Sequence, residues 1–151
     1  MIEIGDKAPE ILGEDENSNL IKISNYKGRK VALYFYPKDS TPGCTAQANN
    51  LRDNYEKLLE AGYQVIGASV DSKESHIKFK DKHNLPFPLI SDTDKKLVNE
   101  FGVWAEKKLF GKTYMGTLRT TFIIDEKGVI ENIITSKQVK TRTHGIQILD
   151  L

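Results

Sequence analysis

A single cysteine carries the most specific chemistry in this sequence. Cys44 is the only thiol among 151 residues, and it stands in the segment Pro37-Lys38-Asp39-Ser40-Thr41-Pro42-Gly43-Cys44-Thr45. An ionised thiol is a strong nucleophile, whereas most unpaired cysteines are small, unreactive core residues. The local structure around Cys44 decides between these two interpretations, and it favours the reactive thiol.

The residues before Cys44 predict a buried strand, and those around it predict the start of a helix. Residues 31–36 are apolar, β-branched or aromatic and are followed by Pro37, which is typical of a buried strand. Thr41 is a good N-cap and Pro42 suits the first helical position, so Cys44 falls in the first turn. There the free backbone N–H groups and the positive end of the helix dipole favour a thiolate over a thiol.

This segment resembles the active site of the peroxiredoxins, thiol peroxidases with a thioredoxin fold. Pro37, Thr41 and Cys44 fit the family motif Pro-x-x-x-Thr/Ser-x-x-Cys. The longer string 34–45, followed by Leu-Arg-Asp at 51–53, is similar to the bacterioferritin comigratory protein (Q-type) branch, as are residues 101–104, 111–114 and 119–125. The resemblance runs from about position 5 to the end of the chain.

The resemblance implies a role for each residue of the motif. Cys44 attacks one oxygen of a hydroperoxide and becomes a sulfenic acid, while water or an alcohol leaves. Thr41 offers its hydroxyl to the thiolate and the peroxide, Arg119 supplies a fixed positive charge, and Pro37 shields the sulfur from bulk water. The backbone N–H groups of Gly43 and Cys44 are expected to hold the oxygen that gains charge, and Gly43 has no side chain to block its approach.

The expected roles of Arg119 and of a further residue, Trp104, each have a plainer structural alternative. Arg119 opens an expected strand, and an arginine entering a strand is usually a solvated edge residue. Trp104 is expected at the substrate site, where it would line an apolar collar for larger hydroperoxides together with Phe110 and Tyr114. The three aromatic residues could equally be ordinary core.

Position 49 sets the expected catalytic cycle. Many members of the branch carry a second, resolving cysteine five positions after the first, and here that position is Asn49. Five residues of helix separate Cα atoms by roughly 8 to 9 Å, beyond the reach of a disulfide, so the helix must partly unwind in those members. With one cysteine, no internal disulfide can form. We expect an external thiol, such as glutathione, a glutaredoxin or a thioredoxin-type partner, to reduce the Cys44 sulfenic acid.

Other cysteine chemistries fit the sequence less well. A redox sensor of the same fold is the main alternative, in which oxidised Cys44 passes the signal to a partner through a mixed disulfide. Thioredoxin-like disulfide exchange normally needs two cysteines. A Cys-His hydrolase needs a histidine base, whereas the Pro-Thr-Cys context activates the sulfur without one.

The remaining motifs predict no metal and no cofactor. His76 and His83 are seven positions apart, but no C-x-x-C or H-x-x-x-H pairing accompanies them or His144, so we interpret the first two as solvated helix residues. The string Gly-Lys-Thr at 111–113 resembles the end of a phosphate-binding loop, but Glu106 stands where that motif requires glycine.

Composition argues against several classes of partner and location. A formal net charge of +1 gives no electrostatic case for nucleic acid or a membrane surface as partner. No apolar stretch approaches the ~18 to 20 residues of a membrane span, and the N-terminus has no signal-peptide pattern. A chain with one cysteine suits a reducing, cytoplasmic setting.

Alternating strands and helices predict one thioredoxin-like α/β domain over residues 1–151, with a central mixed sheet flanked by helices. The final pair of strands is expected to form a hairpin around 125–128. The expected elements after the first strand are a helix over 41–61, a strand over 64–70, a helix from Ser72 to His83, a short strand at 89–90, a helix capped by Asp92 that contains 97–98, strands over 117–124 and 129–135, and a last short helix that starts near Thr141 or Thr143.

Overall fold

A mixed sheet forms the centre of the chain. The computed structural model describes residues 1–151. In spatial order its strands are β5 (Leu89–Ser91), β4 (Tyr63–Ser69), β3 (Lys30–Phe35), β8 (Thr120–Ile124) and β9 (Ile130–Ile134). Strand β3 runs parallel to β4, and β4 runs parallel to β5, whereas β8 pairs antiparallel with both β3 and β9. This arrangement confirms the predicted mixed sheet.

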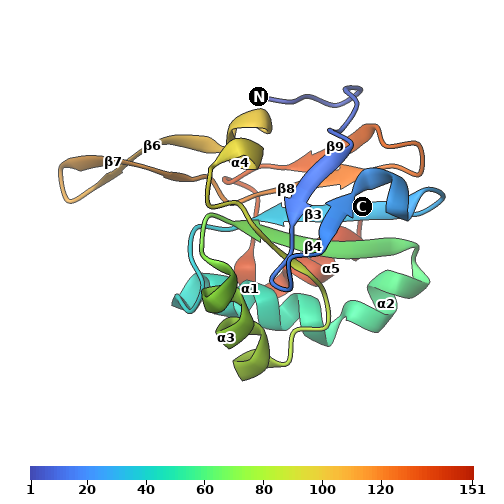
Figure 1. The fold of residues 1–151 in the computed structure, drawn as a ribbon, viewed down its shortest axis with the longest axis horizontal. Coiled ribbons are helices and arrows are strands. Elements are labelled where there is room, and N and C mark those ends of the chain that lie inside the picture. Colours follow the sequence, from blue (N-terminus) through green and yellow to red (C-terminus); the bar gives the residue numbers. More distant parts are fainter.

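Helices and a small hairpin cover the two faces of the sheet. The larger helices gather on one face (Figure 1). They are α1 (Pro42–Asp53), α2 (Tyr55–Glu60), α3 (Lys73–His83) and α5 (His144–Leu149). The opposite face packs against helix α4 (Lys96–Glu100) and the hairpin of β1 (Ile11–Glu14) and β2 (Leu20–Lys22). The chain also contains two 3₁₀ turns, η1 (Ile23–Tyr26) and η2 (Thr141–Thr143). No helix is both long and apolar enough to cross a membrane.

The alternation of β3 divides the core into two clusters. Ala32 and Tyr34 point to the side of α1, α2, α3 and α5, while Leu33 and Phe35 point to the side of α4. Cys44 belongs to the first cluster and is packed against the sheet from α1. Cys44 therefore sits between a helix and the middle strand of the sheet.

Helix α1 is held from the side by the C-terminal helix. The backbone N–H of Gly145, in α5, donates to Asn50 Oδ1 at 2.8 Å. In turn, Thr121 Oγ1 on β8 lies 2.7 Å from His144 Nε2 at the start of α5. These two contacts connect α1 to the sheet through α5.

The predicted helix over 41–61 is two helices in the structure. Asn54 has φ −104° and ψ 8°, which ends α1 and begins α2. Its side-chain Nδ2 donates to the Asn50 carbonyl at 2.9 Å. Its backbone N–H donates to the same carbonyl at 3.1 Å, so the chain bends at Asn54 without losing this helical hydrogen bond. The cap of α4 also differs in detail: Lys95 is its N-cap, while Asp92 accepts the N–H groups of residues 97 and 98 with its two carboxylate oxygens.

Two hairpins were not predicted, and one of them projects from the body as an arm. Strands β6 (Trp104–Leu109) and β7 (Lys112–Thr117) form this arm (Figure 1). The strand expected over 117–124 therefore starts only at Thr120, because Thr117 ends β7. Phe110, at the turn, is 95% exposed and Tyr114 is also exposed, so neither is a core residue. The arm escaped prediction because neither strand, WAEKKL or KTYMGT, alternates apolar and polar residues.

Gly67, in β4, provides a test of the packing beneath the site. A Cβ at this position would lie 2.7 Å from Leu89 Cδ2 and 3.0 Å from the Tyr34 ring. We expect Gly67→Ala to lower the free energy of unfolding by about 1 to 3 kcal/mol, because overpacked cores force side chains from their rotamers. Urea denaturation measures this value. Gly116→Ala, on the arm, is the matched control and should change stability by less than about 0.5 kcal/mol; equal effects of the two substitutions would contradict the packing.

Candidate functional site

The start of α1 has the predicted geometry. Thr41 is the N-cap, with an extended backbone (φ −87°, ψ 155°), and Pro42 occupies the first helical position. The Thr41 hydroxyl does not cap the helix but donates to the Lys38 carbonyl at 2.8 Å. The backbone N–H groups of Gly43 and Cys44 form no hydrogen bond. Two unpaired donors therefore remain at the helix start beside the thiol.

The structure brings Arg119 to Cys44. Phe35, at the end of β3, pairs with Thr120, so Arg119 lies beside the point where the chain leaves β3 for α1. Its Nη1 donates to Cys44 Sγ at 3.4 Å, although 75 positions separate the two residues. Cys44 is only 1% exposed. The sole thiol therefore faces a guanidinium in a place that is largely shielded from water, where charge interactions are strong.

Gly43 allows the guanidinium to come this close. A Cβ on Gly43 would lie 3.2 Å from Arg119 Nη2. Any larger side chain would push the arginine away from the sulfur. The structure thus brings together Thr41, Gly43, Cys44 and Arg119, while Pro37 is half-buried directly after β3.

Trp104 is not brought to this site. It packs with the apolar cluster on the opposite face of the sheet from Cys44, and Lys95 Nζ lies 5.5 Å from the centre of its ring. No hydrogen bond or aromatic contact joins it to the residues around the thiol. Its expected role in substrate binding stays a prediction without a contact to support it.

Three further residues surround the thiol that the sequence analysis missed. Gln47 is fully buried, and its Oε1 accepts from Arg119 Nη1 at 2.8 Å. It lies three positions after Cys44, so the i, i+3 spacing of a helix could have indicated it. Burial has the largest effect on Tyr34 and the charge of the neighbouring Cys44 the next largest, and both raise the pKa of its phenol well above the usual value. The phenol therefore stays protonated. Lys107, from the arm, is half-buried; its pKa is lowered by burial and by the charge of Arg119, against an opposing effect of Cys44.

Asn49, at the expected position of a resolving cysteine, is part of a polar contact between helices. Arg52 Nη1 donates to Asn49 Oδ1 at 3.2 Å and to the His83 carbonyl, at the end of α3, at 2.7 Å. The second half of α1 is therefore connected to α3 through the side chain of Arg52.

The expectation that His76 is a solvated helix residue is wrong. His76 is fully buried, with Nδ1 2.6 Å from Asp39 Oδ2 and Nε2 3.0 Å from the Ile90 carbonyl. Burial acts against the charged imidazole, but the hydrogen bond and charge of Asp39 outweigh it and raise the pKa of His76. The charge-rich sequence of α3 hid the buried face on which His76 lies.

His144 is also fully buried but in the neutral form. Its Nδ1 lies 2.9 Å from Gln147 Oε1, which can only accept, so Nε2 accepts from the Thr121 hydroxyl. Burial lowers the pKa of His144, and the charge of Arg119 adds to this effect, against the hydrogen bond to Gln147.

One cluster has the residue types of a metal site. Potential ligand atoms of Asp39, Asp71 and His76 lie within 4.8 Å of one another. Hydrogen bonds already use these atoms: Asp39 Oδ2 accepts from His76, and Asp71 Oδ2 accepts from the Asp39 N–H and the Ser69 hydroxyl. The cluster is a hydrogen-bond network within the fold, and the other two histidines lie elsewhere.

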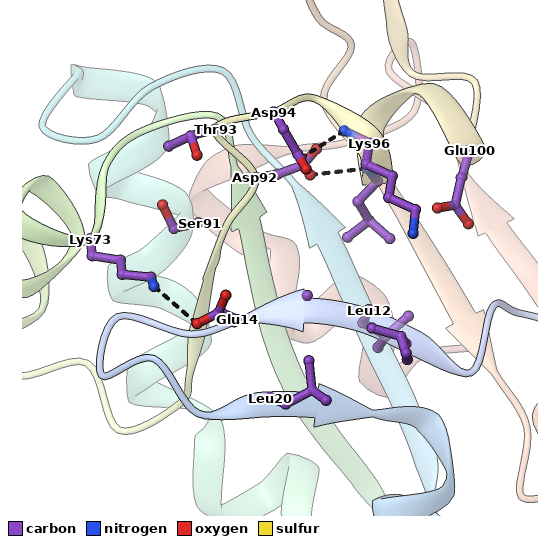
Figure 2. A pocket seen from close by; sticks show the side chains of 13 residues that line it. Leu12, Glu14, Leu20, Lys73, Ser91, Asp92, Thr93, Asp94, Lys96 and Glu100 are labelled. Carbon is purple, nitrogen blue, oxygen red and sulfur yellow. Dashed lines mark hydrogen bonds and ion pairs between the residues drawn. The ribbon is translucent and has the colours of Figure 1, made fainter.

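A pocket of about 280 Å³ lies apart from the thiol, between the β1–β2 hairpin and α4. Figure 2 shows one pair of charged side chains in contact, Lys73 with Glu14, and Asp94 accepts from the backbone N–H of Lys96. Asp92 is used to cap α4. None of its lining residues is a thiol or a histidine. We therefore place the candidate active site at Cys44 and not in this pocket.

Comparison with known proteins gives a consistent answer over nearly the whole chain. Residues 4–133 match the model of the AhpC/TSA family. Peroxiredoxin Bcp of Bacillus subtilis (strain 168) is 48% identical over 98% of this chain and 93% of its own length. Peroxiredoxin Bcp of Escherichia coli (strain K12) is 41% identical over 99% and 94%. Among solved structures, a cysteine-to-serine mutant of Xylella fastidiosa PrxQ has a TM-score of 0.89 at 31% identity, covering 99% of this chain and 94% of that one.

The pKa values of the two buried histidines should be shifted in opposite directions, that of His76 upward and that of His144 downward. His76 is stabilised in its charged form, so its contribution to stability is present below the ordinary histidine pKa of about 6.5 and is lost as pH rises through its higher folded value. The contribution of His144 is present above about 6.5 and is lost as pH falls, because the unfolded chain binds the proton more readily.

NMR titration of the imidazole nitrogens, with each signal assigned from a His→Asn variant, measures both directions. We expect the His76 ring to remain protonated above pH 6.5 and the His144 ring to remain neutral below it. Two ordinary titrations near that pH would contradict the charge states derived from the hydrogen bonds.

Proposed function

The chain belongs to the AhpC/TSA family and is a thiol-dependent peroxidase of the peroxiredoxin type, and from this premise we propose that Cys44 reduces hydroperoxides through a sulfenic acid that an external thiol resolves. The observation that carries the proposal is the contact between the sulfur of the only cysteine and Arg119 Nη1, at 3.4 Å, in the first turn of α1. Hydrogen peroxide and organic hydroperoxides are the proposed substrates. A related solved structure, of the Xanthomonas campestris bacterioferritin comigratory protein, concerns alkyl peroxide reduction.

The proposed reaction is a nucleophilic displacement at oxygen. The Cys44 thiolate attacks the terminal oxygen of the hydroperoxide, an S–O bond forms and the O–O bond breaks. Sulfur loses two electrons and the peroxide gains them; the terminal oxygen keeps its hydrogen as the sulfenic acid, and the alkoxide or hydroxide that leaves takes a proton from water. Such a displacement is fast when positive groups already surround the oxygens that gain charge.

The surrounding residues supply these groups. The Arg119 guanidinium contacts the sulfur, and the N–H groups of Gly43 and Cys44, which have no hydrogen-bond partner, are proposed to receive the peroxide oxygens. Because the Thr41 hydroxyl gives its hydrogen to the Lys38 carbonyl, its oxygen can accept the O–H of the peroxide. Pro37 is proposed to limit the access of bulk water. Gln47 holds Arg119 by accepting from the same nitrogen that contacts the sulfur.

The second half of the cycle needs a thiol from outside the chain. Position 49 is Asn and no other cysteine exists, so no internal disulfide can form. A thiolate of glutathione, a glutaredoxin or a thioredoxin attacks the sulfenic sulfur, which releases water and leaves a mixed disulfide; a second thiol then restores Cys44. Without a reductant, excess peroxide carries the sulfenic acid on to sulfinic acid.

The one-cysteine cycle predicts a defined first product. Treatment with one equivalent of hydrogen peroxide, without added thiol, should give a single added oxygen on the Cys44 peptide by mass spectrometry. A thiol added afterwards should remove this oxygen. Cys44→Ser, which retains both methionines, is the control for oxidation elsewhere. A disulfide-linked dimer through Cys44 as the sole product would contradict the proposal.

The role of Arg119 can be separated from its effect on folding. We expect Arg119→Ala to slow the oxidation of Cys44 by peroxide by on the order of 10² to 10³-fold, as removal of one preorganised charge donor does in other active sites. Stopped-flow measurement of the second-order rate constant tests this. Arg142→Ala removes the same charge from an exposed position and should leave the rate unchanged. An undiminished rate in Arg119→Ala would remove the role given to Arg119.

A further inference from the structure

The loop between β3 and α1 contains a buried carboxylate that the proposed reaction does not use. Asp39 is 5% exposed and lies between Pro37 and Thr41. Its Oδ1 accepts from the Tyr36 hydroxyl at 2.6 Å, and its Oδ2 accepts from the Ser75 hydroxyl at 2.8 Å and from His76 Nδ1 at 2.6 Å. The loop that leads to the thiol is therefore fixed by two side chains of α3.

The charge state of the contact follows from its partners. Both nitrogens of His76 face oxygens that accept hydrogen bonds, those of Asp39 and of the Ile90 carbonyl. Since Asp39 already accepts from two hydroxyl groups, the arrangement that satisfies every atom is an imidazolium paired with a carboxylate. Asp71, whose carboxylate accepts the Asp39 N–H at 2.9 Å, adds a second negative charge nearby.

The position of Asp39 determines the position of the Thr41 hydroxyl. Lys38, next to Asp39, provides the carbonyl to which Thr41 Oγ1 donates at 2.8 Å. Ser40, between Asp39 and Thr41, has φ +63°. This conformation is unfavourable for a residue with a side chain and persists only where the surroundings enforce it. Without the anchor at Asp39, the loop would lose the contact that orients Thr41.

Stability alone does not account for this buried pair. Buried ion pairs often contribute no more to stability than well-packed apolar residues of the same volume, because both charges lose their hydration. What the pair of His76 and Asp39 supplies is directional: one short hydrogen bond, from His76 Nδ1 to Asp39 Oδ2 at 2.6 Å, that fixes one conformation of the loop.

We propose that His76 is a positioning residue of the peroxidase reaction, which acts through Asp39 to hold loop 37–41 so that Thr41 is presented to the hydroperoxide. The inference rests on the proposed function of Cys44 and extends it to α3, on which no residue of the proposed reaction lies. It predicts that loss of the contact impairs the reaction with peroxide, in which Thr41 takes part, more than reactions of Cys44 that do not need Thr41.

A matched pair of substitutions at His76 tests this. The amide nitrogen of asparagine lies near the place of Nδ1, so His76→Asn retains a donor to Asp39 and loses the contact with Ile90. The longer His76→Gln places its amide near Nε2, so it retains the contact with Ile90 and leaves Asp39 without that donor. Both variants remove the same ring and the same charge.

Two rates are measured for each variant: oxidation of Cys44 by hydrogen peroxide and alkylation of Cys44 by iodoacetamide, both per folded protein from circular dichroism. We expect His76→Gln to lower the peroxide rate by up to about 10²-fold, as misplacement of a group by about 1 Å can do, and to leave alkylation within about twofold. His76→Asn should retain most of the peroxide rate.

Each other outcome has a defined meaning. If the wild-type protein reacts slowly with peroxide, the proposed function fails, whatever the variants do. If the wild type is fast and both variants lose the two rates together, or His76→Gln keeps the wild-type peroxide rate, the positioning role is wrong. Should His76→Gln not fold, Tyr36→Phe removes only the hydroxyl donor to Asp39 Oδ1 and must show the same selective loss for the inference to stand.

Discussion

The guanidinium of Arg119 can contact Cys44 only because β8 lies directly beside β3 in the sheet. The antiparallel register places Thr120 opposite the last residue of β3, so the residue before it meets the chain as it turns into α1. Gly43 then provides the space, and Gln47 fixes the same nitrogen from one turn further along the helix. The reactivity of a single sulfur thus depends on a pairing between segments far apart in the sequence.

The sequence predicted what local patterns determine. The strand before Pro37, the N-cap at Thr41 and the helix start at Pro42 follow from residue type and spacing alone, and the structure has all three. The mixed sheet also followed from the alternation of elements. Arg119 is different, because no local pattern distinguishes it from a solvated edge arginine, and only the resemblance to a family pointed to it.

Contacts between distant segments explain what the sequence analysis missed. His76 lies in a helix rich in charged residues, and its partner Asp39 is 37 positions away, so nothing nearby in the sequence indicates that it is buried. The strands of the β6–β7 arm do not alternate apolar and polar residues, and the bend at Asn54 leaves the helical hydrogen bonds on either side of it in place. The buried polar groups around α1 are therefore a property of the tertiary structure: a charged histidine on the side of α3 and a neutral one on the side of α5.

The contact of Arg52 with Asn49 and with the end of α3 has a consequence for how the protein cycles between its oxidation states. Relatives that form a disulfide within this helix must melt part of it at every turnover, so their helix has to be weak enough to open and strong enough to close again. This chain has no such requirement, and Arg52 instead joins the same stretch of α1 to its neighbour. The helix can be as rigid as its packing allows, because the proposed cycle with an external thiol requires no disulfide within it.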